Sequence, residues 1–422
     1  MRLQNLQESP KYKPIKQTLA NIKSNQTSQK DAQMADSRLF LFTSALIGIG
    51  VVMSYSLSSY PVLAYHYSEL HFVQREFASA VMGILLMWAL AQCKPNTFFL
   101  KFGFLLFFVA FFLMIVMPFL PESMATSAGG AKRWIRLPLI SIAPSEFFKI
   151  GFVFFLAWSF SRKFASNQNR NIFQEILVVL PYIAVFVLVV MVLAVMQNDL
   201  GQVVLLALTL TIMLIAAGGS SGLFGVLLLI SGSLASIFIA TSEHRINRLK
   251  SWYANAQDSI LPLLPHRFAD YLRVENLPEP YQIYHATNAL YNGGIFGTGL
   301  GNGIIKLGFL SEVHTDMVLA GIGEELGLVG LSVCVLLIIY IVYRILKIAN
   351  RVQNDVHYLF CVGIAMLIGL SFLINALGVA GLIPLKGIAV PFLSYGGSSM
   401  LANCLAIGLV LSLSQVAQYP KH

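Results

Sequence analysis

The sequence predicts an all-α polytopic membrane protein of about ten transmembrane helices, and three observations support this class. Of the 422 residues, 57% are hydrophobic and only 11% are charged, whereas a soluble domain carries about 25% charged residues. The mean hydropathy of +0.72 exceeds what one compact core can bury. Ten apolar segments recur along the chain, and a bilayer requires helices of about 20 apolar residues each.

These segments set the expected domain organisation. Residues 1–37 are polar, lysine-rich and poor in aromatic residues, which predicts a disordered tail. We find no signal-peptide cleavage site after the first apolar run, so the first helix is expected to be an uncleaved anchor. A transmembrane domain is expected over 38–416, with a C-terminal tail at 417–422. Its helices are expected at about 38–58, 73–93, 98–119, 144–162, 175–195, 201–219, 221–241, 316–345, 357–379 and 398–416.

The basic residues predict the orientation. An even number of helices places both termini on one side, and short connections on that side are rich in Lys and Arg, which favours the cytoplasm. Membrane topology therefore explains the net charge of +9 better than nucleic-acid binding does. The basic residues of these connections are Lys94, Lys101, Arg162, Lys163, Arg170, Arg344, Lys347 and Arg351.

Two outer loops break this rule. The loop after the third segment and the long loop at 242–315 both carry cations, which an anionic ligand at the outer face would retain. The alternative is that these charges only decorate solvated loops. The cations are Lys132, Arg133 and Arg136 in the first loop, and Arg245, Arg248, Lys250, Arg267 and Arg273 in the second.

The long outer loop at 242–315 has two further features. Its prolines argue against long regular helices. A glycine-rich run, NGGIFGTGLGNG at 292–303, predicts tight turns and close backbone packing rather than a dinucleotide site, because no strand-then-helix unit surrounds it. The prolines are Pro262, Pro265, Pro278 and Pro280.

Two short motifs place ionisable groups at the starts of expected helices. In IAPSEFFKI, at 142–150, Glu146 and Lys149 lie three residues apart and are expected to pair, either orienting a polar substrate or closing the helix start. In QNDLG, at 197–201, Asp199 is expected to cap the next helix or to contact a ligand or cation.

A third motif, EVHTDMVLAGIGEELG at 312–327, places a carboxylate where the long loop re-enters the membrane. Burial would raise the proton affinity of Asp316, which makes it a candidate general base. The alternative is that Thr315 or Asp316 caps the helix. Two turns deeper, at least one of Glu324 and Glu325 is expected to face the bundle interior.

A fourth motif, GLIPLKGIAVPFLSYGGSSM at 381–400, breaks the helical pattern at membrane depth. Irregular backbone there is tolerated beside a cavity or within protein, and Lys386 would place a cation in such a cavity. Ser394, Ser398 and Ser399 are expected to satisfy freed backbone groups, and small-residue helix packing is the alternative reading of this segment. Neither the four cysteines nor the eight histidines show zinc-site spacing.

Taken together and in order, these motifs resemble the SEDS family, which comprises the FtsW and RodA proteins of cell division and elongation. The resemblance covers about 38–416, and GEELG together with Lys386 favours FtsW over RodA. Three positions depart from the family pattern: Asn198 replaces a Pro, Gln202 replaces a small residue, and Met317 replaces a Phe. The matching strings are GGAKRWIRL at 129–137, PSEFFK at 144–149, QNDLG at 197–201, HTD at 314–316, GEELG at 323–327 and PLKGIAVPFLSYGGSS at 384–399.

The resemblance implies a peptidoglycan glycosyltransferase that polymerises lipid II into β-1,4-linked glycan strands during septal cell-wall synthesis. The essential aspartate of the family falls on Asp316. An α-linked donor and a β-linked product require one inverting displacement, with a base for the acceptor hydroxyl and cations for the departing pyrophosphate. The expected substrate-binding residues are Lys132, Arg133, Arg136, Glu146, Lys149, Asp199, Arg245, Arg248, His314, Lys386 and Ser394.

No cofactor is required by the sequence, although a divalent cation, Mg²⁺ or Mn²⁺, can share the work at the pyrophosphate, with Asp199 or Glu146 as ligands. The resemblance also implies partners: the class B penicillin-binding protein FtsI and the division proteins FtsQ, FtsL, FtsB and FtsN. The expected location is the cytoplasmic (inner) membrane at the division septum, with the active site outside. Three alternatives stay open: a flippase or transporter for lipid-linked sugars, a RodA-like elongation polymerase, and a non-catalytic scaffold.

Overall fold

The structure, a computed structural model, describes residues 35–417 except 129–130, 137–140, 165–171, 264, 275–279, 311 and 385–386. Most of the predicted N-terminal and C-terminal tails therefore lies outside the described residues. So does Lys386, the predicted cation of the fourth motif.

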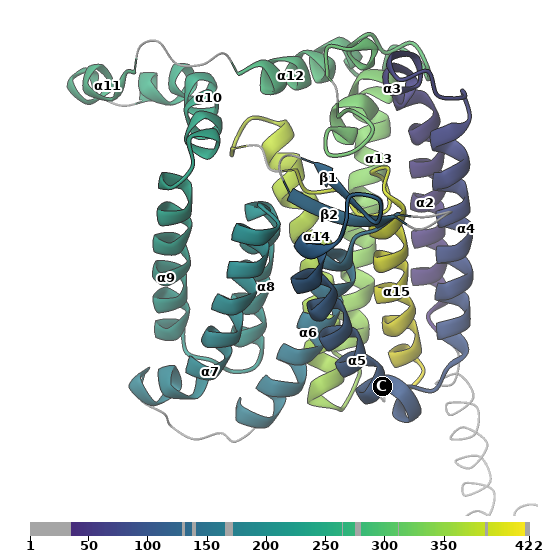
Figure 1. The fold of residues 1–422 in the computed structure, drawn as a ribbon, viewed down its shortest axis with the longest axis vertical. Helices are drawn as coiled ribbons and strands as arrows, with labels where there is room; N and C mark the ends of the chain where they lie inside the picture. Colours follow the sequence, from purple (N-terminus) through teal and green to yellow (C-terminus); the bar gives the residue numbers. More distant parts are fainter. Residues whose placement is uncertain are drawn as a thin grey trace, which may run out of the picture.

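Ten helices stand where the sequence predicts ten apolar segments, and they run side by side as one bundle (Figure 1). Eight of them, all except α6 and α8, are long and apolar enough to cross a membrane. The class of a helical, polytopic membrane protein is thus confirmed, and the count of ten crossings stays a prediction. The ten helices are α2 (Ser37–Leu57), α4 (His71–Gln92), α5 (Pro95–Val116), α6 (Pro144–Phe164), α7 (Ile172–Val190), α8 (Leu200–Ala216), α9 (Ser221–Ala240), α13 (Val318–Ala349), α14 (Asp355–Val379) and α15 (Gly397–Ser414).

The bundle is held together by aromatic packing at its centre. Helix α14 packs against α6, α8 and α13, and α15 lies along α4. Helices α5 and α6 approach closely because Gly103 faces the ring of Phe154, where a methyl group would come within 2.4 Å. In lipid there is no hydrophobic driving force between helices, so they associate through the close packing that such small residues allow. The fully buried rings include Phe148, Phe152, Phe154, Phe160, Phe360 and Phe392.

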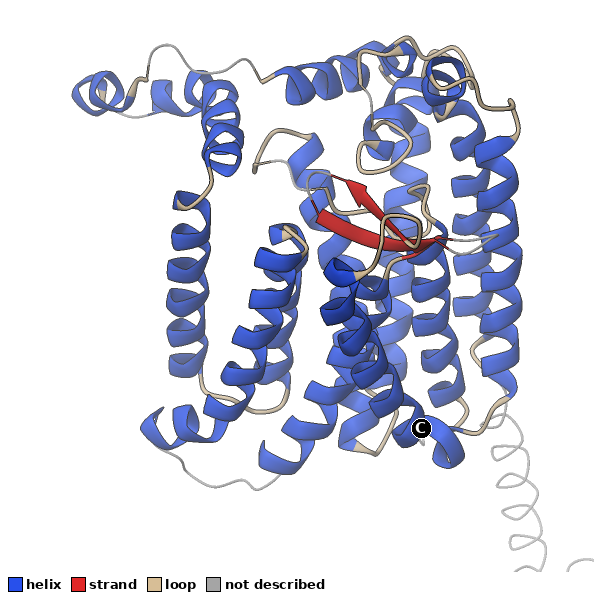
Figure 2. Cartoon of the chain, in the orientation of Figure 1, coloured by secondary structure: helices blue, strands red, loops and turns tan. Residues whose placement is uncertain are grey.

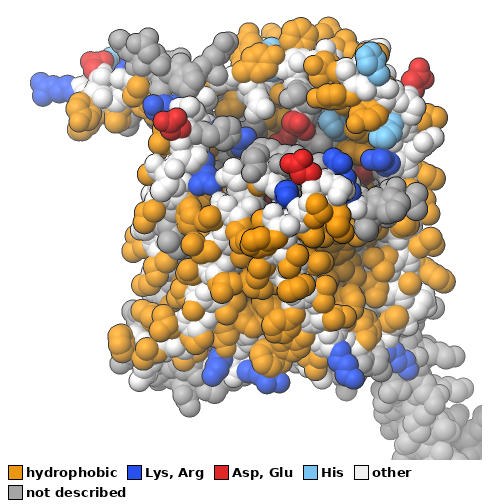
Figure 3. Space-filling model, viewed as in Figure 1, with side chains coloured by type: hydrophobic (Ala, Val, Ile, Leu, Met, Phe, Trp, Pro, Cys, Tyr) orange, Lys and Arg blue, Asp and Glu red, His pale blue; other side chains and the backbone are white. Residues whose placement is uncertain are grey.

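The two ends of the described chain lie at the same face of the bundle. Asp36, just before α2, forms an ion pair with Arg344 near the end of α13. The backbone N–H of Asp36 donates to Ser414 Oγ at the end of α15, at 3.0 Å. Lys and Arg side chains line this face, and a mixed group of acidic and basic side chains gathers in the opposite half, above a hydrophobic band (Figure 3). We call that opposite half the outer half.

A small sheet in the outer half adds strands that the sequence analysis did not predict (Figure 2). Strands β1 (Ala125–Ala128), β2 (Ala131–Arg136) and β3 (Ser141–Ile142) pair antiparallel in the order β1-β2-β3. The connection between α5 and α6 is long enough to fold back twice, and pairing its strands satisfies backbone groups that would otherwise stay unpaired. This sheet carries Lys132, Arg133 and Arg136.

The long outer loop contains a regular helix that the prolines were expected to exclude. Helix α10 (Glu243–Ile260) spans 18 residues, and the two shorter helices α11 (His266–Leu272) and α12 (Tyr281–Gly293) follow it. A last short helix of the outer half, α3 (Ser59–Ala64), follows α2. The expectation was wrong for α10 because all four prolines come after Ile260 in the sequence, and Pro265 and Pro280 directly precede α11 and α12. The indole of Trp252 donates to the carbonyl of Gly381 at 3.0 Å, which fixes α10 to the fourth motif.

Candidate functional site

Hydrogen bonds and packing bring the four sequence motifs together in the outer half. The side-chain amide of Asn375 donates to the carbonyls of Asp316 (2.6 Å) and Ile388 (2.8 Å). Ile388 in turn lies against Gly201, where a methyl group would come within 3.1 Å of Ile388 Cγ1. The segment around Ile388 therefore separates Asp316 on one side from the QNDLG motif on the other.

The fourth motif also contacts the IAPSEFFKI and EVHTD motifs directly. Ser398 Oγ accepts from the backbone N–H of Ala143 (2.8 Å) and donates to the carbonyl of Ser141 (2.6 Å). The backbone N–H of Tyr395 donates to the carbonyl of His314 at 2.9 Å. Ser394 Oγ accepts from the N–H of Val390 at 2.7 Å, so both serines satisfy freed backbone groups as predicted.

Asp316 lies in a turn directly before α13. The residue that caps this helix is Met317, and among the described residues no side chain caps it, so the capping alternative for Thr315 and Asp316 is wrong. Thr315 instead donates to the carboxylate of Glu312 at 2.7 Å. The Oδ1 atom of Asp316 is buried and has no hydrogen-bond partner in the described part of the chain. This oxygen is thus available to accept a proton.

The surroundings of Asp316 suit a base that works near neutral pH. Burial, joined by the negative charge of Glu312, raises the pKa of Asp316 to about 7, although Arg248 on α10 opposes this shift. A carboxylate whose pKa lies near the working pH is a better proton acceptor than an ordinary carboxylate. His314, two residues earlier, is buried, and this burial lowers its pKa, which favours the neutral imidazole.

A second group of charges lies around the start of α6 and α8. Lys149 Nζ and Glu146 Oε2 form the predicted ion pair at 2.8 Å. The carboxylate of Asp199 accepts from the N–H of Gln202 at 3.2 Å, so Asp199 caps α8 as predicted. Gln202 Nε2 donates to Glu146 Oε1 at 3.4 Å and joins the two groups. Burial raises the pKa of Asp199, and Arg133 and Lys149 oppose this shift.

Two of the predicted substrate-binding arginines bind the QNDLG loop. Arg133 donates to the carbonyls of Gln197 (2.9 Å) and Asn198 (3.0 Å). Arg245 donates from Nη2 to the side-chain oxygen of Asn198 (2.8 Å) and from Nη1 to the carbonyl of Phe238 (2.8 Å). These bonds give both arginines a structural role in the site.

The conformation of Asn198 explains why a departure from the family pattern is tolerated. Its φ of 52° lies in the left-handed region, which proline cannot adopt because its ring fixes φ near −65°. Asparagine is among the residues that enter this region most readily. The loop in this protein therefore differs in backbone shape from a loop with proline at the same position.

The remaining cations differ in their surroundings. Lys132 donates to the carbonyl of Leu120 and is held there. Arg136, at the end of β2, and Arg248, on α10, are exposed. The cations whose side chains reach the surface are therefore Arg136 and Arg248, while Lys149 is largely buried and pairs with Glu146.

Two adjacent ionisable residues of α4 escaped the sequence analysis. Glu76 is buried, and its Oε2 accepts from the N–H of Gly396 at 3.1 Å. Arg75 is exposed and contacts Tyr395. The sequence does indicate them, because placing two ionisable residues inside an apolar segment costs free energy and suggests a functional role.

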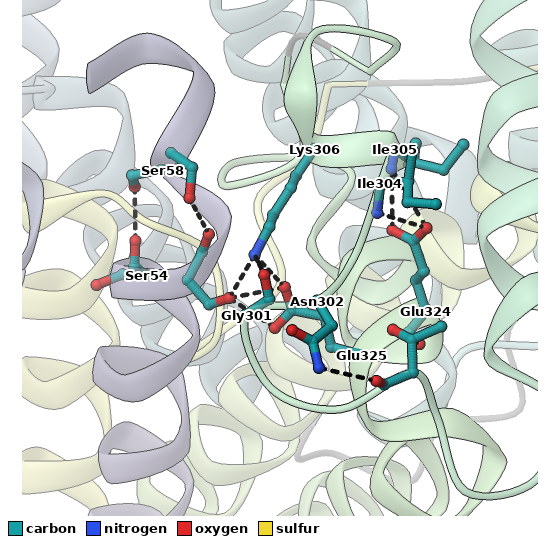
Figure 4. A network of polar contacts seen from close by, with 12 residues as sticks. Ser54, Ser58, Gly301, Asn302, Ile304, Ile305, Lys306, Glu324 and Glu325 are labelled. Atoms are coloured by element: carbon teal, nitrogen blue, oxygen red, sulfur yellow. Dashed lines mark hydrogen bonds and ion pairs between the residues drawn. The ribbon is translucent and has the colours of Figure 1, made fainter. Parts of the chain in front are cut away.

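A buried ion pair ties the glycine-rich run to α13 and α2 (Figure 4). Lys306 is only 3% exposed, and its Nζ lies 2.6 Å from Glu325 Oε1. Ser56 on α2 donates to the same carboxylate at 2.7 Å. Glu324 accepts from the N–H groups of Ile304 (3.0 Å) and Ile305 (3.2 Å). Both glutamates face the interior, which confirms the prediction.

Helix α13 is broken at Gly327, which has φ 66°, and the glycine-rich run lies in the break. The carbonyls of Gly294 and Ile295 accept from the N–H groups of residues 328 (2.9 Å) and 329 (3.1 Å), after the break. Thr298 and Gly299 donate to the carbonyls of residues 324 and 325, before it, both at 3.0 Å. The run thus satisfies backbone groups that the break leaves open.

Only glycine fits where the two backbones meet. A methyl group on Gly297 would lie 2.1 Å from the carbonyl oxygen of Glu325, and one on Gly327 would lie 2.3 Å from the nitrogen of Gly297. The predicted close backbone packing is confirmed. It holds the short first part of α13, which begins directly after Asp316, in one position.

Fold and site together define a helical membrane protein with a polar, charged site in one half of its bundle. The family described as "Cell cycle protein" (FtsW/RodA/SpoVE) matches residues 37–419. The chain belongs to this family, which confirms the resemblance found from the motifs.

Curated relatives and solved structures agree with this assignment. A "Probable peptidoglycan glycosyltransferase FtsW" from Helicobacter pylori strain J99 is 56% identical over 383 residues, covering 90% of this chain and 98% of the relative. A protein of the same name from Trichlorobacter lovleyi is 34% identical over 384 residues, covering 90% and 93%. The Thermus thermophilus rod shape determining protein RodA has the same fold, with a TM-score of 0.60 at 21% identity, covering 92% of this chain and 98% of RodA. A chain of a peptidoglycan synthase complex matches with a TM-score of 0.63 at 20% identity, covering 92% and 99%.

Proposed function

We propose that this protein is a peptidoglycan glycosyltransferase that polymerises lipid II into β-1,4-linked glycan strands during septal cell-wall synthesis. The observation that carries the proposal is the carboxylate of Asp316, which lies in the turn before α13 and faces Gly387 of the fourth motif. One of its oxygens has no hydrogen-bond partner among the described residues, and the cation of Arg248 lies near enough to act on its pKa. The names of the curated relatives support the same activity.

In the proposed reaction, Asp316 accepts the proton of the acceptor sugar hydroxyl as that oxygen attacks the anomeric carbon of the donor. The bond from this carbon to the pyrophosphate oxygen breaks on the opposite side, so an α-linked donor yields a β-linked product. The polyprenyl pyrophosphate leaves with the bonding electron pair, and the proton passes from Asp316 to water. Lys149, Arg136 and Arg248, with Lys386, supply positive charge for the leaving group.

A divalent cation is also part of the proposal, with Asp199 or Glu146 as its expected protein ligands. The described residues contain no group of three or more His, Cys, Asp or Glu side chains placed to hold a metal. Glu146 and Asp199 both accept hydrogen bonds from Gln202, and Glu146 also forms the ion pair with Lys149. Two carboxylates suit a Mg²⁺ ion that is bound mainly by substrate phosphates. We propose that Mg²⁺ or Mn²⁺ would arrive with the pyrophosphate and add positive charge there, with Glu146 or Asp199 as oxygen ligands.

The raised pKa of Asp316 predicts how the rate depends on pH. A base must be deprotonated, so the rate should rise with pH and reach half its maximum near pH 7. Glu312→Gln removes a negative charge that raises this pKa, so the half-maximal pH should fall by about half a unit. Initial polymerisation rates between pH 5 and pH 9 check this, and a half-maximal pH that stays fixed or rises would contradict it.

The different surroundings of two arginines predict different phenotypes. Arg136→Ala removes an exposed cation, so it should raise the lipid II concentration for half-maximal rate about tenfold and leave protein abundance unchanged. Arg133→Ala removes two hydrogen bonds to the QNDLG loop, so it should lower the melting temperature as well. Titration of lipid II and thermal unfolding of both purified variants separate the two roles. Equal loss of abundance in both would assign Arg136 to folding.

Partners and location are part of the proposal. We infer that the protein works in the cytoplasmic membrane at the septum, with cytoplasmic termini and an external active site. The proposed partners are FtsI and the division proteins FtsQ, FtsL, FtsB and FtsN. The match to a chain of a peptidoglycan synthase complex supports a partnership with a cross-linking enzyme. A RodA-like elongation role would instead place the protein along the side wall, which imaging of a tagged chain distinguishes.

The experiment that tests the activity compares detergent with liposomes. Purified protein, alone and with its transpeptidase partner, receives fluorescent lipid II in detergent micelles, where no transport can be scored. A polymerase produces long glycan strands under these conditions. A flippase leaves lipid II unchanged in detergent and moves it across liposome membranes, and a scaffold does neither. Either of the last two outcomes would refute the proposal.

A further inference from the structure

Asn375 is a buried polar residue that the proposed reaction does not use. It lies within α14 and is only 1% exposed. Its Nδ2 donates to two backbone carbonyls from different motifs, that of Asp316 at 2.6 Å and that of Ile388 at 2.8 Å. Because both partners are acceptors, only the NH₂ group can face them, so the orientation of the amide is fixed.

The second partner belongs to the segment that lines Asp316. Gly387, directly before Ile388, faces the carboxylate, and a methyl group there would lie 3.2 Å from Asp316 Oδ2. Asn375 thus fixes the distance between the backbone of Asp316 and the segment of Gly387 and Ile388, which faces the Asp316 carboxylate. A side chain with a single NH₂ group joins segments that lie 59 and 13 positions away from it in the sequence.

The position of this segment bears on both geometry and proton affinity. A base has to lie within hydrogen-bond reach of the hydroxyl it deprotonates, and a displacement of about 1 Å can cost about 100-fold in rate. The segment also contributes to the burial that raises the pKa of Asp316 to about 7. A looser segment would let water reach the Asp316 carboxylate and lower its pKa. A bulkier segment would exclude more water and raise this pKa.

We propose that Asn375 is a positioning residue for the transfer reaction, which sets the placement of the Asp316 carboxylate against Gly387 through its two backbone hydrogen bonds. The inference rests on the proposed function, because it concerns the same base. Asn375 itself does not touch the substrate. Its loss is therefore expected to change turnover rather than the affinity for lipid II.

The test measures kcat, KM and the pH profile of polymerisation for Asn375→Ala and Gly387→Ala. Asn375→Ala should lower kcat about 10- to 100-fold with KM within about twofold. Its half-maximal pH should move down, because water reaching the carboxylate lowers the pKa of Asp316. Gly387→Ala should also lower kcat, but its half-maximal pH should move up, because the added methyl group buries the carboxylate further. A merely structural role would not produce opposite shifts.

Asn403→Ala is the matched control, because that amide donates to the carbonyl of Ser399 at 2.8 Å, one turn away in its own helix. It should retain kcat and the pH profile. Wild-type kcat in folded Asn375→Ala would overturn the inference while the unaltered protein still polymerises lipid II. If Asn375→Ala does not accumulate, Gly387→Ala decides, and an unchanged kcat and pH profile there would overturn the inference. Absence of polymer from the unaltered protein would overturn the proposed function and this inference together.

Discussion

Lys306→Met should strongly destabilise the protein, with the free energy of unfolding lowered by about 3–5 kcal/mol. The substitution removes a cation that is 3% exposed and leaves the carboxylate of Glu325, which is fully buried, without its charge partner at 2.6 Å. An uncompensated buried charge costs far more than the loss of an exposed ion pair. The glycine-rich run would also lose the hydrogen bond that Lys306 donates to the carbonyl of Gly301 at 2.8 Å.

The measurement is the thermal unfolding and the membrane yield of the purified variant. Lys250→Met, on an exposed position of α10, is the control and should unfold like the unaltered protein. Adding Glu325→Gln to Lys306→Met should restore part of the stability, since no buried charge then remains unpaired. A melting temperature for Lys306→Met equal to that of the control would show that the pair is not a stabilising centre.

The membrane helices could be predicted from the sequence because their signal is local. Runs of about 20 apolar residues are sufficient to define a transmembrane candidate, and all ten predicted segments are helical in the structure. The same holds for contacts within one helical turn. The Glu146–Lys149 pair and the Asp199 cap both depend on a spacing of three residues, which the sequence displays directly.

Contacts between distant segments could not be predicted in this way. The sequence presented Arg133 as a free cation of an outer loop, yet its partners are carbonyls 64 and 65 positions away. A backbone carbonyl carries no residue-specific signal, so nothing in the sequence marks it as an acceptor. The burial of Lys306 escaped for the same reason, because it depends on how the glycine-rich run enters the break in α13.

The outer half shows where local rules fail. Proline was expected to exclude long helices from the 242–315 loop, but the rule constrains only the residues next to each proline, and α10 precedes them all. The sheet of β1, β2 and β3 escaped because its strands are short and its polar outer-loop composition resembles an ordinary loop. The role of Asp316 therefore stays a prediction, and the sequence analysis missed residues that support its surroundings, which include Glu76 and Asn375.

Asp316→Asn should abolish polymerisation and leave folding unchanged. The amide keeps the size of the carboxylate and cannot accept the proton of the acceptor hydroxyl, so the rate should fall by at least about 100-fold. Folding should not suffer, because Asp316 Oδ1 makes no hydrogen bond within the described residues and the side chain does not cap α13. Asp316→Ala should behave alike. Loss of activity with an unchanged melting temperature separates a catalytic role from a structural one.

The direct measurement is the initial rate of glycan formation from fluorescent lipid II in detergent, for the unaltered protein and Asp316→Asn at equal concentrations of folded protein. Strand length is read on a gel, and digestion with a β-1,4-specific muramidase identifies the linkage. We expect long, muramidase-sensitive strands from the unaltered protein and none from Asp316→Asn. Strands of equal length and rate from both proteins would contradict the assignment of the base.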